Sequence, residues 1–87
     1  DLFEAVPGRW CVAIGDVCGK GPRAAALAAL ARYALRALSR RHADPAALVE
    51  DLNAEVRREL RHDLRFITGC VGLLRRDGRA LALELAC

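Results

Sequence analysis

The stretch from Arg23 to about Arg41 constrains the fold most, because it consists almost wholly of Ala, Leu and Arg. These residues are among the strongest helix formers. Apolar side chains recur along it at spacings of three and four residues, as the buried stripe of a helix requires: Leu27, Leu30, Ala31, Ala34, Leu35 and Leu38. The pattern predicts an amphipathic helix whose small alanines let it lie close against a sheet.

A second helix is predicted directly after the first. Asp44 suits the N-cap position, and Pro45 suits the first helical position, where its missing N–H costs nothing. An apolar stripe then continues to about Leu60: Leu48, Leu52, Val56 and Leu60. We expect the two helices to form a pair.

Short apolar segments before and after the helix pair predict four strands. The second of them is rich in β-branched and aromatic residues and almost continuously apolar, which is typical of a strand covered on both faces. A turn at Pro7 and Gly8 joins the first two strands, and an Asp-Gly turn across residues 76–79 joins the last two. The predicted strands are Asp1–Ala5, Arg9–Gly15, Phe66–Leu74 and Ala80–Ala86.

The predicted order of elements is therefore strand, strand, helix, helix, strand, strand. Consecutive strands joined by tight turns imply antiparallel pairing, and the helices must cover a face of the resulting sheet. The predicted fold class is α+β, built in layers.

The bulk composition is that of one small globular domain. The 87 residues are 54% hydrophobic and 29% charged, and the lack of any Met indicates a piece taken from a longer protein. The net charge of +3 is spread along the chain with few aromatics beside it, so nucleic-acid binding is not expected. No apolar run reaches the roughly 18 residues of a membrane span and no signal peptide is visible, so we expect a cytoplasmic protein.

The four cysteines do not form a metal-binding motif. No two of them have the short Cys-x-x-Cys spacing of a zinc site: Cys11, Cys18, Cys70 and Cys87. Cys11 and Cys70 lie in apolar runs, where we expect small buried hydrophobic residues and not disulfide partners.

The segment Ile14–Pro22 carries the one pattern that points to chemistry. Asp16 stands at the end of the buried strand and opens into a glycine-rich loop before the helix. A carboxylate there, with backbone carbonyls facing the same way, presents the hard oxygen ligands that Mg²⁺ and Mn²⁺ prefer. In the other interpretation, Asp16 only accepts hydrogen bonds from N–H groups of a tight turn. Three glycines would set the loop geometry in either case: Gly15, Gly19 and Gly21.

The same segment does not fit a phosphate-binding P-loop. That motif needs four residues between its first Gly and the Gly-Lys pair, and a Ser or Thr after the Lys. Here three residues separate Gly15 from Gly19 and Lys20, and Gly21 follows. Nucleotide binding is therefore not expected.

The segment Val12–Ala25 resembles the Gly-Asp-Val-x-Gly-(His/Lys)-Gly segment of bacterial metal-dependent serine/threonine phosphatases of the type 2C class. The branch it resembles is that of the stage II sporulation phosphatase and the sigma-factor regulators. Three further pieces match that family in order along the chain: Asp1-Leu2-Phe3 in its opening motif, Leu52-Asn53 in its second helix, and Phe66-Ile67-Thr68 in a strand. The resemblance covers residues 1–87 as the N-terminal half of the phosphatase domain.

The resemblance implies a layered β-sandwich flanked by helices, with two Mn²⁺ or Mg²⁺ ions held by acidic residues at one end. Asp16 matches the catalytic carboxylate that contacts both ions, and Val17 matches a residue that binds through its backbone carbonyl. Lys20 matches a position of Lys or His that could approach the substrate phosphate, the alternative being a solvated loop lysine. Asp1 matches the second acid of the opening motif, while the metal-binding acid lies three residues upstream of the chain and the family's late aspartates lie beyond it.

The implied function is hydrolysis of phosphoserine or phosphothreonine on a regulatory protein, such as an anti-sigma-factor antagonist, by a metal-activated water. Residues 1–87 alone are then expected to be inactive, because they hold only one of several metal ligands. The alternative is a non-catalytic phosphatase-like binding module that has lost ligands elsewhere. A small helical partner-binding domain is a third hypothesis, which leaves Asp16 without an explanation.

The remaining polar residues receive structural interpretations. His42 and His62 lie at predicted helix ends and are expected on the surface without a partner at ligand spacing. Asn53 is expected to cap a helix or to form a hydrogen bond in the core. Thr68 is expected to pack on its strand, or to support the metal loop from behind.

Overall fold

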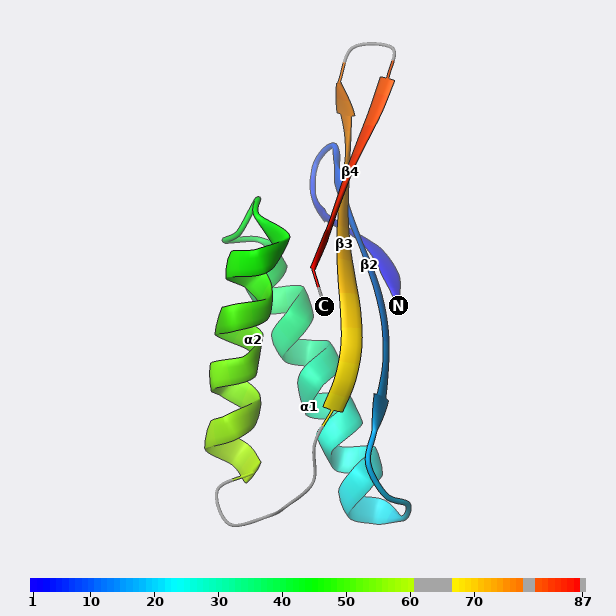
Figure 1. The fold of residues 1–87 in the computed structure, drawn as a ribbon, viewed down its shortest axis with the longest axis vertical. Coiled ribbons are helices and arrows are strands. Elements are labelled where there is room, and N and C mark those ends of the chain that lie inside the picture. The colour runs from blue at the N-terminus through cyan, green and yellow to red at the C-terminus, as the bar shows by residue number, and fades with distance from the viewer. Residues whose placement is uncertain (61–66, 78–79, 87) are drawn as a thin grey trace.

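The computed structural model describes residues 1–60, 67–77 and 80–86, which form a sheet with two helices on one of its faces (Figure 1). The α+β class and the order of elements predicted from the sequence are confirmed. The elements are β1 (Leu2–Val6), β2 (Arg9–Val17), α1 (Pro22–Ser39), α2 (Pro45–Leu60), β3 (Ile67–Asp77) and β4 (Ala80–Ala86).

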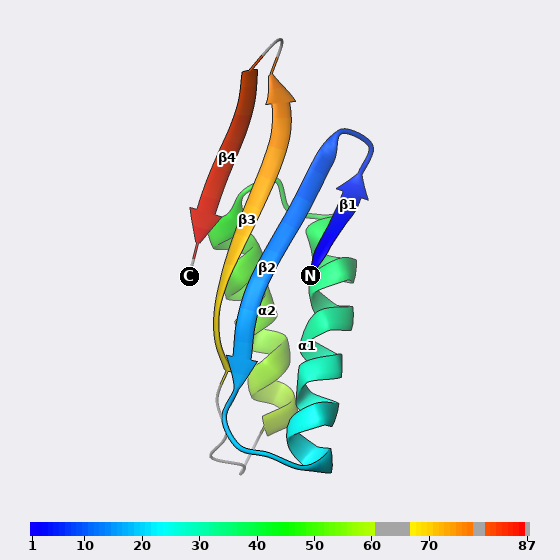
Figure 2. The ribbon, with the colours of Figure 1, turned by 90° about the vertical axis from the view of Figure 1, so that its right-hand side faces the viewer.

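The sheet is antiparallel throughout, and each strand pairs with its neighbour along the chain. The strand order is β1-β2-β3-β4, as Figure 2 shows. The longest ladder joins β2 to β3, from Arg9 opposite Arg75 to Val17 opposite Ile67. The turn predicted across residues 76–79 includes residues 78 and 79, which lie outside the described part of the chain. Within that part the strands form one sheet, so the second sheet of a sandwich remains an expectation for the longer protein.

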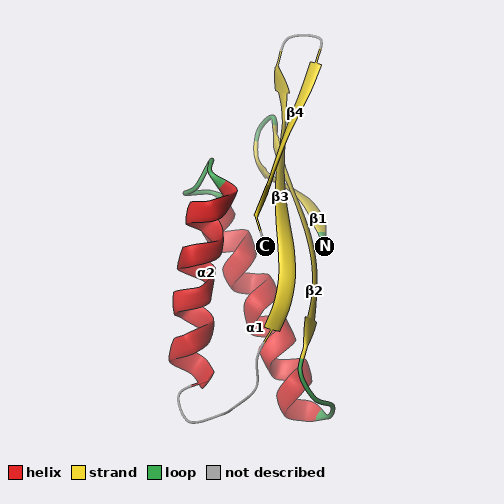
Figure 3. Ribbon diagram, viewed as in Figure 1, coloured by secondary structure: helices red, strands yellow, loops and turns green. Residues whose placement is uncertain are grey.

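Both helices pack on the same side of the sheet, side by side (Figure 3). Side chains of a strand alternate between its two faces, and the odd-numbered residues of β1, β2 and β3 point toward the helices. The core forms where these residues meet the apolar stripes of α1 and α2. Its buried members are Ala5, Cys11, Leu35, Leu38, Leu48, Val71 and Leu73.

The opposite face of the sheet, which we call the outer face, is apolar and largely exposed. Its most exposed large side chains are Leu2 at 64%, Trp10 at 42%, Ile14 at 77%, Leu83 at 53% and Leu85 at 65%. The prediction that the second strand is covered on both faces is therefore wrong for this chain. The reason is that both helices lie on one side, so the continuous apolar run is buried on that side alone.

The helix ends follow the local chemistry of the sequence. Pro22 is the first residue of α1, preceded by Gly21 at φ 93°. Asp44 caps α2, because its Oδ1 accepts a hydrogen bond from the N–H of Ala46 at 3.1 Å. No helix in the described residues is both long and apolar enough to cross a membrane.

The cysteines differ in their environments. Cys11 is fully buried and free, and burial raises the pKa of its thiol. Cys18 is exposed and free. Cys70 is disulfide-bonded, which corrects the expectation of a buried hydrophobic thiol: it lies half-buried on the outer face, away from the core. A disulfide is unusual for the reduced cytoplasmic protein expected from the sequence. The fourth cysteine, Cys87, lies outside the described residues.

Candidate functional site

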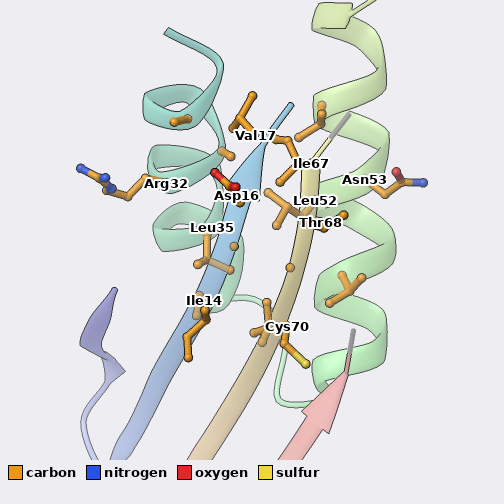
Figure 4. A pocket seen from close by; sticks show the side chains of 18 of the residues that line it. Ile14, Asp16, Val17, Arg32, Leu35, Leu52, Asn53, Ile67, Thr68 and Cys70 are labelled. Atoms are coloured by element: carbon orange, nitrogen blue, oxygen red, sulfur yellow. The ribbon is translucent and has the colours of Figure 1, made fainter. Parts of the chain in front are cut away.

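Asp16 is the next-to-last residue of β2, which runs two residues further than the sequence predicted. Thr68 of β3 lies directly opposite it in the ladder. Strand alternation places Asp16 on the outer face together with Ile14, at the end of β2 that leads into the loop before α1 (Figure 4). The strand end predicted for Asp16 is thus confirmed.

The carboxylate of Asp16 is exposed and accepts no hydrogen bond and forms no ion pair with any residue in the described part of the chain. This geometry disfavours the interpretation in which backbone N–H groups of a tight turn satisfy the side chain. A carboxylate left open at a strand end is available to a ligand.

A groove of about 990 Å³ lies between the inner face of the sheet and the helices, and its lining reaches Asp16. Most of its walls are apolar side chains of α1, α2 and the ends of β2 and β3. The acids that border it are Asp1 and Asp16, and Arg32 and Arg57 border it as well. The groove is mainly apolar and its few charges are of both signs, so within the described residues it is not an acidic cleft.

Two of the labelled polar side chains of this groove do not converge on Asp16. Arg32 of α1 and Asn53 of α2 project sideways, away from the strands, in Figure 4. Asn53 lies in the middle of α2 and is exposed, so it is neither the cap nor the core hydrogen-bonding residue expected from the sequence. Thr68 is also exposed, since its side chain stands on the uncovered face of β3.

The three glycines of the segment serve different purposes. Gly19 and Gly21 have φ values of 95° and 93°, which confirms the loop geometry expected of them. Gly15 instead lies inside β2 and is not among the glycines with positive φ. A Cβ on Gly15 would approach the carbonyl oxygen of Thr68 to 2.9 Å, so this glycine permits close contact between β2 and β3 beside Asp16.

The two other predicted site residues, Val17 and Lys20, follow Asp16 along the chain. Val17 ends β2, half-buried, opposite Ile67. Lys20 is exposed in the loop that follows, and its side chain contacts no other described residue by hydrogen bond or ion pair. Both residues therefore lie where β2 ends and the loop before α1 begins.

The described residues contain no group of three or more His, Cys, Asp or Glu side chains that could hold a metal ion. Asp1 is the second acid that borders the groove, and its carboxylate forms an ion pair with Arg36. Both carboxylate oxygens accept hydrogen bonds from Arg36, at 3.1 and 3.2 Å. His42 contacts Asp51 of α2 at 2.8 Å, so it has a partner that sequence reasoning did not give it. His62 lies outside the described residues.

Sequence reasoning also missed the contacts that tie the first hairpin to α1. Arg36 holds Asp1 and lies over the ring of Phe3, with its Cζ 4.6 Å from the ring centroid. Arg9 donates a hydrogen bond from Nη2 to the carbonyl of Ser39 at 2.8 Å. The spacing of these residues along the chain gave no signal, because each contact joins positions 30 or more residues apart.

Comparison with known protein families gives a match over nearly the whole chain. The model of the family described as stage II sporulation protein E matches residues 6–85. The chain belongs to this family. A search of curated proteins and a search of solved structures each gave no match.

Membership in the stage II sporulation protein E family confirms the resemblance seen in the sequence and relates the chain to type 2C-like phosphatases. Families of that kind use divalent cations, so the residues present must be compared with such a site. Asp16 fits as one ligand, because it is an open carboxylate with hard oxygen atoms and no competing partner in the described part. It fits as part of a site only, since one carboxylate does not offset the charge of two divalent ions.

Proposed function

We propose that the longer protein to which this chain belongs is a metal-dependent phosphatase that removes phosphate from phosphoserine or phosphothreonine on a regulatory protein. Membership in the stage II sporulation protein E family supports this proposal. The observation that carries it is the open carboxylate of Asp16 at the strand end, inside the segment that resembles the phosphatases.

The register of the first hairpin supports a shared site at this end of the sheet. Leu2 lies opposite Val12, and Asp1 exchanges backbone hydrogen bonds with Ala13 at 2.7 and 2.8 Å. If the same ladder continues, the residue three positions before Asp1 lies opposite Asp16 on the same face. Directly opposite residues in an antiparallel pair have Cβ atoms roughly 5 Å apart. The metal-binding acid that the resemblance implies at that upstream position would therefore stand beside Asp16.

Each residue of the segment has a defined task in this proposal. The carboxylate of Asp16 and the backbone carbonyl of Val17 would hold Mn²⁺ or Mg²⁺, and Gly15 lets the two strands approach closely behind them. When bound, the cations would supply the positive charge that activates water for attack on phosphorus. The 87 residues by themselves are expected to be inactive, because the remaining carboxylates lie outside them.

The class of substrate rests on the family relation alone. We propose a phosphorylated anti-sigma-factor antagonist, because the resembling branch includes regulators of such proteins. Lys20 stands exposed next to the proposed site, where its ammonium group could contact a phosphate group of the substrate.

Substitution of Asp16 in the longer protein tests the proposal. We expect Asp16→Ala to lower Mn²⁺-dependent hydrolysis of a chromogenic phosphate ester by at least about 100-fold, because loss of groups that merely orient metal ligands already costs 10–100-fold. Val17→Gly is the matched control next to it: it keeps the carbonyl, so most of the activity should remain, with at most about 1 kcal/mol lost from the free energy of unfolding.

Two outcomes would contradict the proposal. Equal losses in the two variants would show that the Val17 side chain matters as much as the Asp16 carboxylate. A wild-type longer protein that binds a phosphorylated regulator but hydrolyses nothing with either Mn²⁺ or Mg²⁺ would favour the non-catalytic binding module instead.

A further inference from the structure

The first strand of the sheet is an edge strand with a weakly specified register. β1 has five residues, pairs with β2 alone among the described strands, and its register shifts between Glu4 and Val6. Short edge strands with an irregular ladder are prone to slip, and a slip of one residue turns every side chain to the other face. Something besides the ladder must therefore fix the alignment of β1.

Arg36 supplies contacts of that kind from the last turn of α1. Its Nε and Nη2 atoms donate to the two carboxylate oxygens of Asp1, at 3.2 and 3.1 Å, in the paired geometry that only a guanidinium offers. Its Cζ atom lies 4.6 Å from the ring centroid of Phe3. Asp1 and Phe3 both point toward the helices, so one side chain of α1 holds two successive inward positions of β1. We call Asp1, Phe3 and Arg36 the strand clamp.

The strand clamp fixes the part of β1 that directly follows the proposed upstream acid, so it would set the position of that acid relative to Asp16. Asp1 is fixed beside Ala13 by both backbone hydrogen bonds, three residues along β2 from Asp16. A slip of β1 by one residue would move the residue three positions before Asp1 to the inner face, away from Asp16. The clamp opposes this slip, because Asp1 would then lose its partner on α1.

We propose that Arg36 is a positioning residue for the metal site: through Asp1 it fixes the register of β1, and so the distance between Asp16 and the acid upstream of Asp1. This inference rests on the proposed function. It assigns a task to an exposed arginine in the last turn of α1. The pair is partly exposed, with side-chain exposures of 50% for Arg36 and 23% for Asp1, so its contribution to global stability is small.

The test compares Arg36→Met, Arg36→Lys and a matched control in the longer protein. Mn²⁺ affinity is measured directly by electron paramagnetic resonance of the free ion, alongside phosphatase activity and thermal unfolding. We expect Arg36→Met to weaken Mn²⁺ binding on the order of tenfold, as loss of a ligand-orienting group does, with a midpoint of unfolding within a few degrees of wild type. The Mn²⁺ affinity of Arg36→Lys should lie between those of wild type and Arg36→Met, because a lysine keeps the charge but loses the bidentate contact with the carboxylate.

The control is Arg40→Met, which removes an exposed arginine one turn further along, whose side chain forms no hydrogen bond or ion pair in the described part. It should leave Mn²⁺ affinity unchanged. The double variant Asp1→Asn with Arg36→Met should bind Mn²⁺ no more weakly than either single variant, because both changes break one interaction.

The outcomes separate this inference from the proposed function. If wild type binds Mn²⁺ and hydrolyses phosphate esters while Arg36→Met keeps wild-type affinity, the positioning task is wrong and the proposed function stands. If Arg36→Met and the Arg40→Met control weaken binding equally, the positioning task is also wrong. If wild type neither binds Mn²⁺ nor hydrolyses phosphate esters, both the positioning task and the proposed function are wrong.

Discussion

At the scale of single residues, the backbones of β2 and β3 lie close together beside Asp16. Gly15 lies one position before Asp16, and a Cβ there would stand 2.9 Å from the carbonyl oxygen of Thr68. That oxygen belongs to the backbone of the neighbouring strand, so it cannot move without shifting the ladder. A glycine at this position is therefore a condition for the geometry of Asp16 and not a matter of loop flexibility.

We predict that Gly15→Ala destabilises the longer protein by about 1–3 kcal/mol, the usual range for forcing extra atoms into a packed region, and lowers phosphatase activity with it. Gly72→Ala is the matched control. Its added Cβ would also meet an atom at 2.9 Å, but that atom is Cδ2 of Leu85, an exposed side chain that can rotate. Denaturant titration of both variants checks the prediction, and an equal loss in the two would show that backbone contact is not the deciding factor.

At the scale of elements, each helix begins for a different reason. α1 starts at Pro22 after Gly21, and no side chain caps it. α2 starts at Pro45, where Asp44 provides two acceptors: its carboxylate binds the N–H of Ala46, and its carbonyl accepts from Leu48 at 3.1 Å. The start of α2 therefore depends on one side chain in a way that the start of α1 does not.

We predict that Asp44→Ala lowers the free energy of unfolding by about 1 kcal/mol, because it leaves an N–H group of the first turn without its acceptor. Asp44→Asn should retain most of the stability, since an asparagine oxygen caps about as well. Equilibrium unfolding followed by circular dichroism measures both variants. Stability unchanged in Asp44→Ala would mean that water replaces the cap at no cost.

At the scale of the whole molecule, the two faces of the sheet are unequal. The inner face packs on the helices, while the outer face leaves large apolar side chains exposed, Ile14 and Leu85 among the most exposed. Exposed apolar patches on this scale usually mark an interface or lead to association. The face ends at Asp16, so whatever covers it in the longer protein also borders the proposed site.

We predict that the 87-residue chain on its own self-associates through the outer face at micromolar concentrations, as partly covered sheets do. The pair of substitutions Ile14→Thr and Leu85→Thr should shift sedimentation toward the monomer. Tyr33→Gln is the matched control, because Tyr33 is 74% exposed, close to the 77% of Ile14, but lies on α1. The fluorescence of Trp10, the single tryptophan, reports the same event from within the face. A wild-type chain that stays monomeric, or association lost equally in Tyr33→Gln, would contradict the prediction.

The sequence by itself determined the elements and their order. Helix propensity from Arg23 onward, the capping pair Asp44 and Pro45, and the turn at Pro7 and Gly8 act over a few residues, so local patterns were enough to place them. It also placed Asp16 at a strand end beside a glycine loop. The limits of β4 match the prediction, while β1, β2 and β3 end one to three residues further along than predicted, because ladder partners and not local propensity decide where pairing stops.

Only the tertiary structure decided which side of each strand is covered, and with what. The continuous apolarity of β2 did not show that both helices lie on one face and leave Ile14 and Asp16 on the other. Nor did the sequence show that Gly15 is required by a neighbouring backbone, or that Arg36 binds Asp1 across 35 positions of the chain. These features depend on strand register and helix packing, which are set by contacts between distant segments and therefore leave no local pattern.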